Sequence, residues 1–134
     1  YEPGTLKAVN SKGKEEFVLK TAGEPAAIRL IADRSKIKAC KNDLSYVKIE
    51  LVDKNGNVVP ETSLPVKIEC TGKGTVIAGG NAAYADMESF RSLTPNTFRG
   101  KAIAIVQPDG EKGDIQVKVS AKGLEDASIV ITTY

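Results

Sequence analysis

The sequence predicts an all-β protein that folds as an antiparallel β-sandwich. Residues 47–52 alternate apolar and charged side chains at a period of two, which is typical of a strand with one buried face. The run ends near Asn55-Gly56, a pair that favours the tight turn of a β-hairpin, and a β-branched run resumes at Val58. Similar runs recur along the chain, and no segment shows the period of a helix of ordinary length.

Seven strands are predicted after Pro25, at the regular spacing of a sandwich. Gly, Asn, Asp and Pro cluster between the runs, as expected for turns. Seven strands in about 110 residues match the strand count and size of an immunoglobulin-like sandwich. The predicted strands span residues 26–34, 45–53, 64–71, 75–78, 98–107, 114–121 and 126–133.

The alternation within each run also predicts the core. Successive side chains of a strand point to opposite faces, so the apolar positions of one run share the inner face. The predicted core consists of Ile28, Leu30, Val47, Ile49, Leu51, Val66, Ile68, Ile103, Ile105, Val117, Val119, Ile129 and Ile131.

Two segments stand apart from the regular strands. Residues 1–24 are interpreted as a hairpin remnant of a preceding domain plus a linker, and residues 25–134 as the sandwich, because a hairpin is only marginally stable by itself. The start at Tyr1 rather than Met agrees with a piece of a longer protein. The long connection at residues 79–97 includes residues 82–90, which are compatible with a short helical turn. A connection of this length is expected to be functional or to pack over the end of the sandwich.

Composition makes most catalytic and metal sites hard to build. The chain has no His and no Trp, so the usual base of a nucleophilic triad is missing, and we expect no metal and no cofactor. Lys and Arg total 19 against 17 Asp and Glu, a net charge of +2, and the basic residues are dispersed, so nucleic acid is not an expected partner. No apolar run is long enough for membrane insertion.

The two cysteines, Cys40 and Cys70, are expected to be free, partly buried thiols. A disulfide between them in an oxidising compartment remains the alternative, since two cysteines alone form no recognisable framework.

Two short motifs resemble ligand-binding loops but lack essential residues. A calcium loop that began at Asp53 would need glycine at position six and glutamate at position twelve, where this chain has Val58 and Leu64. Residues 72–75 look like the end of a phosphate loop, yet no helix follows them. Hairpin and β-turn structures are expected at both places.

Paired carboxylates could serve glycoside hydrolysis, which needs two of them across a cleft. Asp86 and Glu88 share the long connection, and Asp109 and Glu111 share a turn. Each pair is expected in an exposed polar setting, with no apolar pocket implied that would raise one pKa, so all four are interpreted as solvated surface groups.

Aromatic and guanidinium side chains gather around the long connection and form the candidate contact site. Such a mixture suits either a sugar ring or the surface of a neighbouring domain, and we favour the second use, since interfaces are enriched in Tyr, Phe and Arg. The candidate residues are Tyr84, Phe90, Arg91, Phe98 and Arg99.

A family resemblance rests on residues 28–34, 43–47, 52–60 and 98–107, together with Gly72, Gly74 and residues 88–90. These stretches resemble the carboxy-terminal immunoglobulin-like domain of glycoside hydrolase family 2 enzymes of the β-galactosidase type, as found in relatives of gut Bacteroides. Residues 1–9 resemble the end of the domain that precedes it. Residues 79–82 depart from the Asp-Asn-Gly-like corner that is common in the family.

The resemblance implies an accessory domain in a larger enzyme. In the family the two catalytic glutamates lie in a separate barrel, so no catalytic residue carries over and the chain itself is expected not to be an enzyme. The implied partners are other domains of the parent enzyme, with a glycan as a further candidate. The implied location is the periplasm, the cell surface or the exterior of a bacterium. A carbohydrate-binding module and an invasin-type surface adhesion domain remain alternatives.

Overall fold

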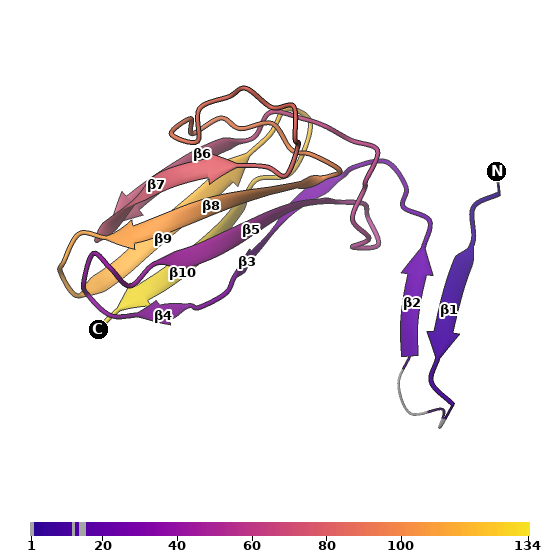
Figure 1. The fold of residues 1–134 in the computed structure, drawn as a ribbon, viewed down its shortest axis with the longest axis horizontal. Coiled ribbons are helices and arrows are strands. Elements are labelled where there is room, and N and C mark those ends of the chain that lie inside the picture. The colour runs from indigo at the N-terminus through magenta and orange to yellow at the C-terminus, as the bar shows by residue number, and fades with distance from the viewer. Residues whose placement is uncertain (1, 12, 14–15) are drawn as a thin grey trace.

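The computed structural model describes residues 2–11, 13 and 16–134, and its secondary structure within them is entirely β (Figure 1). β1 (Thr5–Val9) and β2 (Glu16–Lys20) form an antiparallel hairpin that projects from one end of a β-sandwich. The amino terminus lies beside the hairpin, and the carboxy terminus lies at the far end of the sandwich.

The sandwich has two sheets of four strands each. Every strand pairing is antiparallel except the short parallel contact between β4 and β10, so the predicted antiparallel sandwich is confirmed. One sheet contains, in order, β3 (Ala27–Ala32), β5 (Ser45–Val52), β8 (Lys101–Pro108) and β7 (Gly74–Gly80). The other contains β4 (Lys36–Ile37), β10 (Ala127–Thr133), β9 (Gly113–Ser120) and β6 (Lys67–Gly72).

The prediction missed β4. It gave one strand over residues 26–34, whereas β3 ends at Ala32 and a separate short strand follows at residues 36–37. The chain leaves the first sheet after Ala32 and joins the second at Lys36. At the corner the Asp33 carboxylate accepts the backbone N–H of Tyr46 at 2.8 Å and the Ser45 hydroxyl at 3.2 Å. A strand of two residues is too short to show a period in the sequence.

The prediction was also wrong at residues 98–100, which form a turn rather than the start of a strand. Phe98 and Lys101 exchange two backbone hydrogen bonds of 2.8 and 3.0 Å, and β8 begins at Lys101. Arg99 and Gly100 both have positive φ, 51° and 72°, as in a two-residue hairpin turn. Asn or Gly normally occupies the position of Arg99 in such a turn, so the sequence lacks the usual signal.

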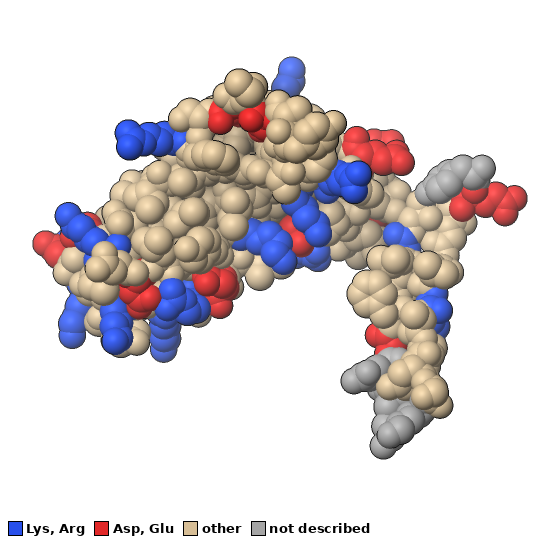
Figure 2. Space-filling view, viewed as in Figure 1, with Lys and Arg blue, Asp and Glu red and all other residues tan. Residues whose placement is uncertain are grey.

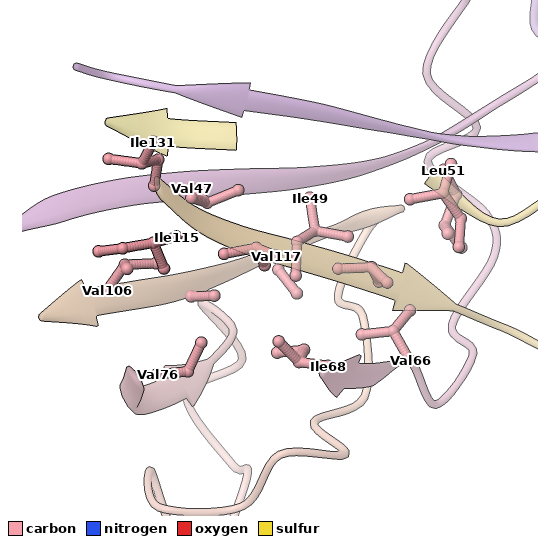
Figure 3. Packing of buried hydrophobic residues seen from close by; sticks show 14 of the residues in the cluster. Val47, Ile49, Leu51, Val66, Ile68, Val76, Val106, Ile115, Val117 and Ile131 are labelled. Atoms are coloured by element: carbon pink, nitrogen blue, oxygen red, sulfur yellow. The ribbon is translucent and has the colours of Figure 1, made fainter. Parts of the chain in front are cut away.

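The core lies between the two sheets (Figure 3). Nine predicted core residues are buried, and Leu30 and Ile129 pack against the core while half-buried. The nine confirmed residues are Ile28, Val47, Ile49, Leu51, Val66, Ile68, Val117, Val119 and Ile131. The prediction missed Ile37, Val76, Ala102, Ala104, Val106 and Ile115.

The prediction was wrong about which face of β8 is buried. Ile103 is 39% exposed and Ile105 is half-buried, whereas Ala102 and Ala104 are buried. Cross-strand partners share a face, and Ala102 and Ala104 pair with the fully buried Ile49 and Val47 of β5. The small side chains therefore point inward and the two isoleucines point outward.

The cysteines are separate thiols, as expected, but only one of them is partly buried. Cys40 is exposed, so that part of the prediction was wrong, and Cys70 is half-buried. Burial raises the pKa of the Cys70 thiol above its ordinary value.

Truncating an inward side chain of the core should cost far more stability than truncating an outward one of the same size. Ile115→Ala should lower the free energy of unfolding by about 3 kcal/mol, because a fully buried isoleucine leaves a cavity. The control Ile103→Ala, on the outer face of β8, should cost about 1 kcal/mol. Urea unfolding of the two variants checks this, and equal losses would contradict the assignment of the β8 faces.

Candidate functional site

The long connection between β7 and β8 is fastened along the edge of the sandwich. Backbone N–H groups of Val66 and Ile68 donate to the carbonyls of Pro95 and Leu93 at 3.0 and 2.8 Å, so the connection extends the sheet beyond β6. The expected helical turn within residues 82–90 is limited to one bond, from Asp86 N–H to the Ala83 carbonyl at 3.3 Å. The connection is thus a packed loop with its own internal hydrogen bonds.

The carboxylates of this loop serve as hydrogen-bond acceptors within it. Asp86 accepts the Asn81 side-chain amide at 2.5 Å and the backbone N–H of Glu88 at 2.9 Å. Glu88 accepts the side-chain amide of Asn96 at 2.8 Å. Both acidic residues are exposed, and the loop bonds that they accept order its backbone.

The structure does not bring the five predicted contact residues into one site. Phe98 and Arg99 line a groove, and the Arg99 guanidinium lies over the Phe98 ring at 5.6 Å from its centroid. Phe90 lines a separate small hollow. Tyr84, which is 99% exposed, and the exposed Arg91 line neither of these two cavities.

The groove beside the turn at residues 98–101 is an open cavity with a mostly apolar lining. Its volume is about 610 Å³. Sequence reasoning missed most of its lining, because the residues come from three distant segments and no local pattern marks them. The lining residues are Val58, Pro60, Asn81, Ala82, Phe98, Arg99, Lys101, Ala102 and Ile103.

A second hollow, of about 750 Å³, lies between the hairpin and the sandwich. One side is lined by Pro3 and residues 19–25, and the other by residues 58–62. Val58 and Pro60 line both this hollow and the groove, so the two cavities lie on either side of one loop.

The Asp53 carboxylate connects that loop to the linker after the hairpin. One oxygen accepts the Gly23 N–H at 2.8 Å and the Asn57 side-chain amide at 3.1 Å, and the other accepts the N–H groups of Asn55 and Asn57 at 2.9 Å each. These bonds, led by the one from Gly23, lower the pKa of Asp53 to about 2. The expected hairpin turn is therefore present, with Asp53 as its acceptor.

The described part of the chain contains no group of three or more His, Cys, Asp and Glu side chains that could hold a metal ion. A search of the same residues for a helix long and apolar enough to cross a membrane finds none.

These observations define the class of module, which is a two-sheet immunoglobulin-like sandwich. A hairpin precedes the sandwich, and an apolar groove lies on its surface. A family model described as glycoside hydrolase family 2 C-terminal domain 5 matches residues 28–130, and the chain belongs to this family.

The chain spans less than a fifth of the length of the two relatives described next. It is 33% identical over 135 residues to the β-galactosidase BoGH2A of Bacteroides ovatus, a match that covers 98% of this chain and 16% of that protein. A crystal structure of a glycosyl hydrolase family 2 member from Bacteroides cellulosilyticus matches with a TM-score of 0.92 at 38% identity. That match covers 100% of this chain and 18% of the other, so it includes both hairpin and sandwich.

A more distant likeness supports the fold alone. The D00-D0 domain of intimin matches with a TM-score of 0.61 at 17% identity, covering 97% of this chain and 62% of that one.

Removing the Asp53 charge should destabilise the protein in a pH-dependent way. Hydrogen bonds hold the pKa of Asp53 at about 2, below its ordinary value of 3.8. At a pH above 3.8 the ionised carboxylate therefore stabilises the folded state. This contribution disappears as the pH falls towards 2. Asp53→Asn should therefore lower the melting temperature by several degrees at neutral pH and by progressively less in acid. The control Glu61→Gln, at an exposed carboxylate, should change little at any pH. A pH-independent deficit in Asp53→Asn, measured by thermal unfolding, would contradict the assignment.

Proposed function

We propose that this chain is a non-catalytic accessory domain of a β-galactosidase-like family 2 glycoside hydrolase, held against other domains of the same polypeptide. The observation that carries the proposal is the match to BoGH2A, in which 98% of this chain corresponds to 16% of a β-galactosidase. A segment of that proportion is one module among several.

The carboxylates support a non-catalytic role for the chain itself. A general acid in glycoside hydrolysis needs a raised pKa, whereas the large shift at Asp53 is downward and its oxygens accept four hydrogen bonds. Asp86 and Glu88 are occupied in ordering their own loop. Glu111 forms an ion pair with Lys73.

The hairpin supports contact with a preceding domain. Leu6 pairs with Leu19 and Ala8 pairs with Phe17, so one face of the hairpin is apolar throughout. Leu6, Phe17 and Leu19 are nevertheless 68, 64 and 53% exposed. A two-stranded hairpin with an uncovered apolar face is marginally stable, and we propose that residues 1–24 pack against the domain that precedes them.

A carbohydrate-binding role is the second candidate, and the exposure of two loop aromatics favours it. Tyr84 is 99% and Phe90 is 70% exposed, and exposed rings can stack on sugars. Against this role, the Arg99 guanidinium already lies over the ring of Phe98, and Phe98 and Phe90 line two different cavities, neither of which Tyr84 lines.

The accessory role predicts no catalysis by the purified 134-residue chain. A full-length parent should hydrolyse an aryl β-galactoside, and the chain alone should release no product above the buffer blank. Turnover by the chain that is lost in Glu88→Gln, while the comparable loop variant Ser89→Ala retains it, would overturn the proposal.

The interdomain role predicts weak glycan binding by the same chain. Galactose, lactose and a panel of oligosaccharides should bind no more tightly than about millimolar, since only scattered rings are available to stack. Titration calorimetry measures this. Saturable binding well below millimolar that is weakened by Tyr84→Ala or Phe90→Ala, with Tyr46→Ala as the control on the sheet, would establish a carbohydrate-binding module instead.

A further inference from the structure

We infer that the groove beside the Phe98–Lys101 turn is a docking site for an acidic segment of the parent polypeptide that inserts an apolar side chain, an inference that rests on the function proposed above. The groove has a volume of about 610 Å³, and Val58, Pro60 and Ile103 contribute apolar side chains to its lining. Pockets of this character at protein interfaces receive the large apolar side chains that contribute most to binding.

The charges around the groove favour an acidic occupant. Within the described residues, the side chains of Arg99 and Lys101 form no ion pair. Lys101 pairs through its backbone with Glu50, whose carboxylate is already bound by Arg29 at 2.6 and 2.9 Å and lies 3.9 Å from Lys48. The nearest buried carboxylate is therefore already matched by Arg29 and Lys48, and an occupant with carboxylates of its own complements the unpaired charges of Arg99 and Lys101.

The surface view agrees with this distribution. In Figure 2 the middle of the visible face, around the positions of β5 and β8 in Figure 1, is largely uncharged. Lys and Arg side chains, with acidic side chains among them, lie where this face approaches the hairpin, and others lie at the far end of the sandwich. Uncharged surface and cations are therefore adjacent on this face.

The polar groups of the groove suit a carboxylate better than a sugar. The Asn81 side-chain amide donates to Asp86 and to the Asn96 carbonyl, and its oxygen accepts a backbone N–H, so both of its donors are used. The other polar side chains of the groove are those of Arg99 and Lys101, which can only donate hydrogen bonds. A sugar presents both donors and acceptors, and the Arg99 guanidinium already lies over the Phe98 ring on which a sugar would stack.

The position of the groove favours an occupant from the same polypeptide. Val58 and Pro60 line both the groove and the hollow between hairpin and sandwich. A domain that covers the apolar face of the hairpin and fills that hollow therefore reaches the groove on the other side of the same loop. The chain spans 16% of BoGH2A, so the length outside this module is ample for such a domain in that relative.

Photo-cross-linking in the full-length parent tests the inference. With benzoylphenylalanine in place of Ile103, irradiation should give a product at monomer mass, and peptide mapping should locate the link in a segment where Asp or Glu adjoins a large apolar residue. Combined Arg99→Glu and Lys101→Glu should reduce the yield by about fivefold or more, because like charges repel. The milder pair Arg99→Gln and Lys101→Gln serves if the first variant does not fold. The matched control reverses two cations outside the groove lining. This double variant, Arg91→Glu with Lys122→Glu, should leave the cross-linking yield unchanged.

Two further probes make the outcome decisive. The same cross-linker in place of Val130, an outward residue of β10 that is 47% exposed, gives the background yield. A yield at 103 no higher than this background, a product at dimer mass, or a yield insensitive to the charge reversal would overturn the inference. A probe in place of Phe17 separates the two proposals. If the probe at 17 cross-links to another domain of the parent and the probe at 103 does not, only the groove inference fails. If neither probe cross-links, the proposed interdomain role fails as well.

Discussion

One buried carboxylate, that of Asp53, fixes how the parts of this protein are placed relative to one another. It accepts hydrogen bonds from the linker at Gly23 and from the turn at Asn55 and Asn57, so the linker after the hairpin and the loop after β5 are held by the same carboxylate. A carboxylate that accepts several N–H groups is strongly held in its ionised form. The hollow between hairpin and sandwich is lined by Gly23 on one side and by residues 58–62, which follow this turn, on the other.

The sheet formed by β3, β5, β8 and β7 has apolar side chains on both faces. The inner face is covered by the other sheet, whereas on the outer face Ile31, Tyr46 and Ile103 remain 39 to 42% exposed. An antiparallel sheet that faces water usually presents polar side chains there. Together with the apolar face of the hairpin, this outer face agrees with the interdomain role proposed above.

Alternation along a strand predicts that two faces exist but not which one is buried. In β9 the outward positions are polar, so Val117 and Val119 were correctly placed in the core. In β8 both faces are apolar, and the register with β5 turned Ala104 inward and Ile103 outward. The sequence could not predict β4 either, because a two-residue strand is defined by its partner and not by a pattern of its own.

The sequence by itself determined the all-β class, most strands of the sandwich, the turn at Asn55-Gly56 and the absence of histidine chemistry, because periodicity, turn residues and composition are local properties. Only the tertiary structure decided where a partner could dock. Phe98 and Arg99 were candidates from residue type, but their groove also needs Val58 and Ile103, which are distant in sequence. Such residues become neighbours only when strand register and loop contacts join them, and these depend on long-range packing that no local pattern encodes.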